Sequence, residues 1–94
     1  MSRIYVDPDK CRGAAARLRQ LSGELKAARG EMTLLAERLG GAWQGRASDS
    51  FLERNGRVAK EADRLGSDAE DLAGDIETAA AAYEETERRL KGEL

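Results

Sequence analysis

Few side chains in this 94-residue sequence can carry out chemistry, and their spacing does not form a catalytic set. Histidine, the usual acid–base side chain near neutral pH, does not occur. The single cysteine, Cys11, cannot form an internal disulfide, and we interpret it as a small hydrophobic residue of the helix seam. There is no nucleophile–base pair, metal-ligand set or phosphate-binding glycine loop. The sequence therefore predicts a protein that is not an enzyme, with no cofactor, no metal and no small-molecule substrate.

Two short patterns can instead take part in recognition. Trp43-Gln44-Gly45 ends a six-residue stretch, 40–45, that contains three glycines. Trp43 can pack across the open end of a turn there while Gly45 permits a tight backbone path, and for the turn itself we favour this purely structural role over a binding one. The second pattern is Tyr83, Glu87, Leu90 and Leu94, whose helical spacings place them on one side of a helix. Taken alone, Tyr83 can be a seam residue and Glu87 a solvated one.

The elements that position these patterns are two long helices. Asp7 and Pro8 are typical of a helix start, because Asp caps free N–H groups and Pro suits the first turn. Apolar residues at alternating steps of three and four then predict a helix over 8–40, a turn over 41–46 and a second helix over 47–92. Ser48, Gly45 and Arg46 are alternative starts for the second helix. We therefore predict an all-α fold, with residues 1–94 forming one antiparallel helix-turn-helix hairpin.

The seam of this hairpin, or of a paired bundle, is expected to be apolar. Its main residues are Leu18, Leu21, Leu25 and Leu35 in the 8–40 helix and Val58, Leu65, Leu72 and Ile76 in the 47–92 helix. Asn55 is its one strongly polar member, which either sets the register or is a tolerated polar group. With this register Lys10 lies approximately opposite Glu77, so the last turns, including Tyr83, are expected to have no partner in the 8–40 helix.

A second row of small residues lies beside this seam. Its members recur every seven residues and are Ala59, Gly66, Ala73 and Ala80, with Ala15, Ser22 and Ala36 in the first helix. A wider apolar stripe suits a helix buried against two neighbours, which predicts that two hairpins pair into a four-helix bundle. The alternative is that alanine is present only because it is a good helix former.

Charge is divided unevenly along the chain. Residues 1–60 carry twelve basic and seven acidic side chains, whereas residues 61–94 carry four basic and eleven acidic ones. The two parts should attract each other within one chain or across a pair, and nucleic acid is not an expected partner. No apolar run approaches the ~20 residues needed to span a bilayer, and the first residues lack the hydrophobic region of a Sec signal.

Length, hairpin pattern, central Trp43-Gln44-Gly45 and absent Sec signal together resemble the WXG, or ESAT-like (early secreted antigenic target), family of type VII secretion substrates. Tyr83 and Glu87 match the family's Tyr-x-x-x-Asp/Glu export pattern, and Leu90 and Leu94 fit its longer form. The resemblance implies pairing with itself or with a paralogous hairpin in the cytoplasm. It also implies recognition of this tail, beside the partner's Trp-x-Gly turn, by the secretion machine's membrane ATPase, and secretion without a Sec signal peptide.

Two other functions fit the same pattern. The chain can act as a cytosolic adaptor or targeting chaperone that pairs with the helical domain of a larger exported toxin. It can also be a coiled-coil scaffold without a link to secretion, in which case changes at Trp43 and Tyr83 have no effect on its location.

Overall fold

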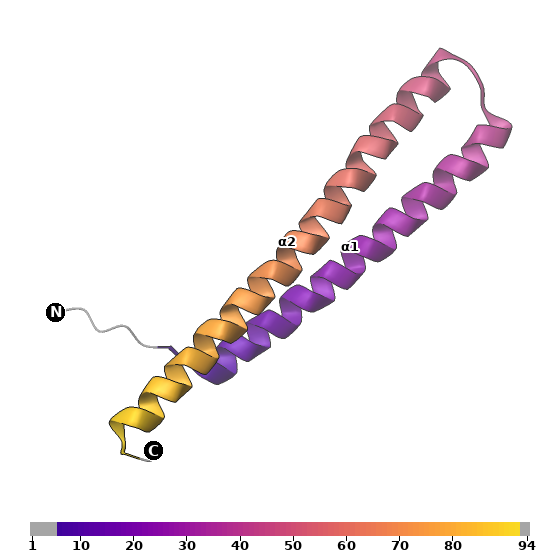
Figure 1. The fold of residues 1–94 in the computed structure, drawn as a ribbon. Coiled ribbons are helices and arrows are strands. Elements are labelled where there is room, and N and C mark those ends of the chain that lie inside the picture. The colour runs from indigo at the N-terminus through magenta and orange to yellow at the C-terminus, as the bar shows by residue number, and fades with distance from the viewer. Residues whose placement is uncertain (1–5, 93–94) are drawn as a thin grey trace.

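The computed structural model describes residues 6–92 and consists of two antiparallel helices, α1 (Pro8–Ala42) and α2 (Arg46–Leu90) (Figure 1). Residues 43–45 connect them, and the hairpin measures 71 × 25 × 15 Å. The predicted helix-turn-helix hairpin is confirmed, although α1 ends two residues later and α2 begins one residue earlier than the sequence predicts. Because α2 is longer, its C-terminal turns extend beyond the start of α1 (Figure 1).

Local residues define both ends of the connection and the start of α1. The Asp7 carboxylate accepts hydrogen bonds from the backbone N–H groups of Asp9 and Lys10, at 3.1 and 3.2 Å, which confirms it as the N-cap. Gly45 caps α2 with a φ of 116°, a conformation that residues with a Cβ rarely adopt. The buried Ser48 hydroxyl donates to the Trp43 carbonyl at 2.9 Å, so it holds the turn rather than capping the helix.

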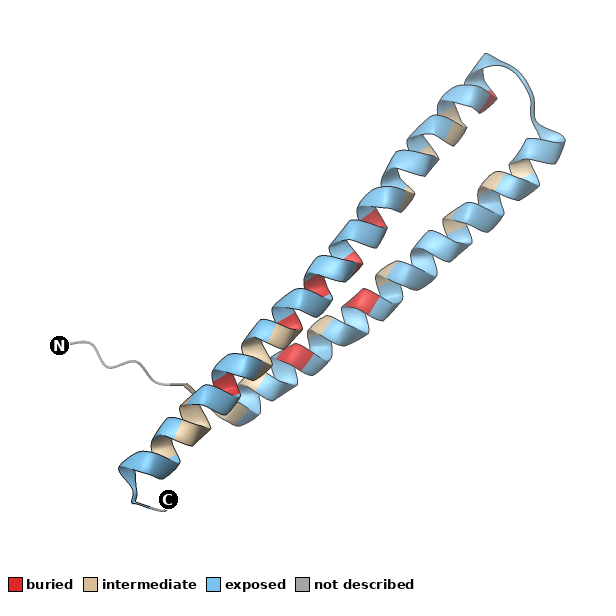
Figure 2. Cartoon of the chain, in the orientation of Figure 1, coloured by how far each residue is buried: buried red, intermediate tan, exposed pale blue. Residues whose placement is uncertain are grey.

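The buried seam between α1 and α2 consists of small residues, so the predicted leucines do not form the seam of the single hairpin and stay a prediction for the seam of a paired bundle. The buried residues along the facing sides of the two helices are Ala15 and Ser22 in α1 and Ala62, Gly66, Ala69, Ala73 and Ala80 in α2 (Figure 2). Most of the predicted seam leucines are exposed. The row that we expected beside the seam thus lies inside it, because small side chains allow the two backbones to approach closely.

Two contacts establish the register of the helices. A Cβ built on Gly66 would lie 3.5 Å from the Ser22 carbonyl oxygen and 3.7 Å from the Leu25 Cβ. Nearer the turn, the Asn55 side-chain amide donates to the Met32 carbonyl oxygen at 3.0 Å. This hydrogen bond links the two helices and satisfies a half-buried polar group, as expected of a residue that helps to set register.

Oppositely charged side chains join the helices along one edge of the seam. Arg19 binds Glu77 at 2.5 Å, and the other three pairs are Arg12–Glu84, Lys26–Glu70 at 3.1 Å and Arg29–Asp63 at 3.7 Å. The partners are offset along the axis because helical side chains lean toward their own N-terminus, so in antiparallel helices they lean toward each other. The expected attraction between the basic and acidic parts of the sequence therefore operates within one chain.

The Arg19–Glu77 pair makes stability depend on pH. The hydrogen bond from Arg19 holds the pKa of Glu77 below its ordinary value, so the pair stabilises the folded state above the unfolded pKa. This contribution is lost as pH falls through the lowered pKa. We expect the thermal midpoint to drop as pH falls from about 5 to about 3, and Glu77→Gln to reduce that drop. Circular dichroism melts measure both, and an identical pH dependence in the variant would contradict the assignment.

Candidate functional site

The C-terminal part of α2 brings Tyr83 and Glu87 together on one side of the helix. They are one turn apart and line a common pocket of about 360 Å³. Its other lining residues are Val6, Pro8, Glu84 and Arg88. Tyr83 and Glu87 are both half-buried, so the start of α1 and the segment before it partly cover this surface.

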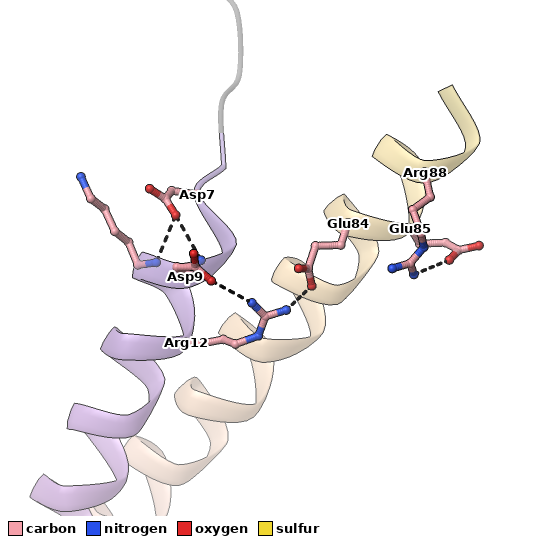
Figure 3. Close-up of polar contacts among 7 residues, drawn as sticks. Asp7, Asp9, Arg12, Glu84, Glu85 and Arg88 are labelled. Carbon is pink, nitrogen blue, oxygen red and sulfur yellow. Dashed lines mark hydrogen bonds and ion pairs between the residues drawn. The ribbon is translucent and has the colours of Figure 1, made fainter. Parts of the chain in front are cut away.

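Ion pairs surround this pocket and hold its charged groups in place (Figure 3). Arg12 bridges Asp9, at 3.4 Å, and Glu84 on α2. On the next turn Arg88 binds Glu85 at 2.8 Å, and this hydrogen bond lowers the pKa of the Glu85 carboxyl. The Arg12–Glu84 pair joins the two helices at the open end of the hairpin, and the Glu84 and Glu85 carboxylates beside the tyrosine are both paired with arginines.

The expectation that Tyr83 has no partner in the first helix is wrong. Pro8 lines the same pocket as Tyr83, and Arg12 binds the neighbouring Glu84. Gly66 lies against Ser22 and Leu25, and the two helices are antiparallel. Each step back along α1 therefore corresponds to one step forward along α2, which places Pro8 beside residues 80–83. The overhang therefore begins one turn later than expected.

The remaining tail residues have different surroundings from Tyr83. Leu90 is 82% exposed at the end of α2, and the Glu87 carboxylate lies 3.6 Å from the Lys91 ammonium. Leu94 lies outside the described residues. An apolar side chain this exposed at a helix end is available to a partner, although its role in export stays a prediction.

The Trp43-Gln44-Gly45 turn lies at the other end of the hairpin from the tail (Figure 1). The Trp43 ring packs on Phe51, with centroids 5.8 Å apart and a 49° tilt, and 38% of the residue stays exposed. The hairpin is 71 Å long, so one chain cannot present its tail beside its own turn. A combined surface of tail and turn would require a second hairpin that runs in the opposite direction.

A third surface lies along the side of the seam opposite the ion pairs. We call it the leucine edge, and its exposed residues are Leu21, Leu35, Val58, Leu65 and Leu72, each between 36 and 56% exposed. At its centre is a groove of about 430 Å³, lined by Leu21, Leu25, Leu65, Ala69 and Leu72 with Glu24 and Asp68 at its margins. An apolar stripe of this length is typical of a protein–protein interface.

Sequence reasoning missed the acidic margin of this groove. Glu24 and Asp68 directly precede the groove residues Leu25 and Ala69, so they flank the apolar stripe of the heptad repeat, where charges often determine partner choice. The heptad spacing of these acidic residues is visible in the sequence. It indicates the margin of a docking surface only when the neighbouring leucines are known to be exposed.

Residues 6–92 contain no group of three or more histidine, cysteine, aspartate or glutamate side chains arranged to hold a metal ion. Within the same range, neither helix has a stretch apolar and long enough to cross a membrane. Cys11 is a free, half-buried thiol in the first turns of α1.

An extended two-helix hairpin with an exposed apolar edge defines a small protein-interaction module. Comparison with protein families identifies it further, because residues 3–88 match the family model "WXG100: Proteins of 100 residues with WXG". The chain belongs to this family of small, helical, ESAT-like substrates of type VII secretion, whose members typically pair with one another. Membership supports a role as a secretion substrate rather than an enzyme. No curated protein and no solved structure matches the chain.

Proposed function

We propose that this chain is a type VII secretion substrate that leaves the cell as one half of a hairpin pair. In this proposal the secretion ATPase recognises Tyr83, Glu87, Leu90 and Leu94 of the tail. The family match over residues 3–88 carries the proposal, since it covers both the turn and the Tyr83–Glu87 pattern. The hairpin geometry supports it, because turn and tail lie at opposite ends and only a second hairpin can bring them together.

The side chains of the tail suit recognition by a receptor groove. Tyr83 and Glu87 lie on one side of α2, and the exposed Leu90 continues that side by one further turn. A receptor that accepts this helix would bury Leu90 and contact the Glu87 carboxylate, as in other helix-in-groove interactions. The half-buried Tyr83 requires the segment around Val6 and Pro8 to move aside or to form part of the recognised surface.

Export of two tail variants tests this proposal. We expect Tyr83→Ala and Glu87→Gln each to lower the secreted fraction by about ten-fold or more, the effect of losing ~1.4 kcal/mol of receptor binding. Thr86→Ala, on the same turns but outside the pattern, is the matched control. The measurement is immunoblotting of medium and cell lysate from a host with a working type VII system, with circular dichroism to confirm folding. Undiminished export of both variants would refute the assigned role of the tail.

A further inference from the structure

Two rows of charged side chains flank the leucine edge, one on each helix. The row on α1 is Arg17, Glu24, Glu31 and Arg38, and the row on α2 is Arg54, Glu61, Asp68 and Asp75. Each row repeats every seven residues, so its members point in nearly the same direction. Glu24 and Asp68 line the central groove, and Glu31 lies beside Leu35 in a neighbouring hollow. We call the five acidic residues of these rows the acidic rim.

The acidic rim is only partly neutralised within the chain. Arg64 binds both Glu61 and Asp68, the latter at 2.9 Å, and it lowers the pKa of Glu61. The ion pairs of residues 6–92 do not involve the other three members. These are Glu24, Glu31 and Asp75, and all are exposed. The basic residues of the rows lie only at the ends of the stripe.

The other edge of the seam provides a contrast. There the basic side chains of α1 meet the acidic side chains of α2 in four pairs, so the charges are satisfied inside one hairpin. Side chains two residues apart on a helix point in directions that differ by ~200°. Asp63 and Glu70 come two residues before Leu65 and Leu72, so they point away from those leucines. The leucine edge therefore carries unpaired acidic side chains beside exposed apolar ones, whereas the acidic side chains of the opposite edge are paired within the hairpin.

Pairing of two identical hairpins through the leucine edge would bring acidic rims together. A two-fold axis can stack α1 on α1 and α2 on α2, or it can stack α1 on α2 of the second copy. The first arrangement places Glu61, Asp68 and Asp75 beside the same residues of the second copy. By the register of Gly66 with Ser22 and Leu25, the second arrangement places Glu24 near Asp68 and Glu31 near Glu61, while Arg17 lies near the level of Asp75. Like charges therefore meet at the centre of the stripe in both cases, and such contacts oppose association.

We propose that the leucine edge selects a different hairpin, one with lysine or arginine at the positions that flank its own apolar stripe, over a second copy of this chain. This inference rests on the proposed function, in which the chain is half of a hairpin pair. The apolar groove provides the contact area, and the acidic rim determines the partner. A basic rim on the partner would form the ion pairs that Glu24, Glu31 and Asp75 lack in the single chain.

A charge-reversed copy of the chain itself is the probe. It carries Glu24→Lys, Glu31→Lys and Asp75→Lys, which remove no ion pair of the hairpin. A control copy carries Glu37→Lys, Asp49→Lys and Glu53→Lys, which are exposed acidic residues away from the leucine edge. Of these only Glu53 forms an ion pair, with Arg57 on its own helix. Both copies have the same net charge. Circular dichroism confirms that each is helical before sedimentation velocity measures the association of every mixture.

We expect the wild-type chain to bind the charge-reversed copy about ten-fold or more tightly than it binds itself or the control copy. Raising the salt from about 0.05 M to about 0.5 M should narrow this difference, since exposed charges are screened. Equal binding to the reversed and control copies, tight self-association of the wild type, or no complex with the reversed copy would each overturn the proposal. None of these results would change the export of the Tyr83 and Glu87 variants, so the two proposals fail separately.

Discussion

Replacing Ala73 with glutamate is expected to unfold the hairpin. Ala73 is 0% exposed in the seam between α1 and α2, where it contributes to the close approach of the helices. A larger side chain there would push the helices apart, and its carboxylate would lose water without gaining a partner. The cost is about 3 kcal/mol or more, which is comparable to the entire stability of a small single-core domain. Urea titration followed by circular dichroism at 222 nm measures the loss.

The adjacent residue is the matched control for this prediction. Leu72 is 53% exposed on the leucine edge, so Leu72→Glu places the carboxylate in water. Leucine and glutamate have similar helix propensities, and we expect the urea midpoint to change by the equivalent of less than about 1 kcal/mol. The order of the two effects is decisive. If Leu72→Glu destabilised the hairpin more than Ala73→Glu, the leucines would form its seam and the alanines its surface.

The sequence did not predict that the alanines, rather than the leucines, are buried between the two helices. The three-four spacing revealed two helices, their antiparallel hairpin and their bounds to within two residues. It did not reveal which of two neighbouring rows faces the other helix, because Leu65 and Gly66 obey the same heptad period. Hydrophobicity favoured the leucine row. The structure instead places Gly66 against Ser22, a choice that depends on how closely two backbones can approach rather than on transfer free energy.

The candidate recognition residues were predictable to a similar extent. Helical spacing alone placed Tyr83 and Glu87 on one side of the second helix, and α2 does continue through both. Spacing could not show that Val6 and Pro8 cover Tyr83, because that contact depends on the register of the helices and on the chain before α1. Gly45 was predictable in another way, since its φ of 116° is the backbone path that a glycine at a tight turn permits.

Removing two leucines from the edge is expected to weaken pairing strongly while the hairpin stays folded. Leu65 and Leu72 line the central groove and are 43 and 53% exposed, so their remaining apolar surface becomes buried only when a partner docks. Exchanging both for glutamine removes roughly 2 kcal/mol of that burial, or about thirty-fold in affinity. Urea titration should show near wild-type stability, because neither side chain belongs to the buried seam.

The measurement is sedimentation velocity of the Leu65→Gln, Leu72→Gln variant mixed with the charge-reversed copy. Leu90→Gln is the control, since Leu90 is also exposed, at 82%, but lies at the C-terminal end of α2 away from the leucine edge. Glutamine leaves the charge of the acidic rim unchanged, so a loss of binding by the double variant alone isolates the apolar contribution from the electrostatic one. Binding equal to that of the wild type would mean that the hairpins meet through another face, and the exposed leucines would then need a different partner.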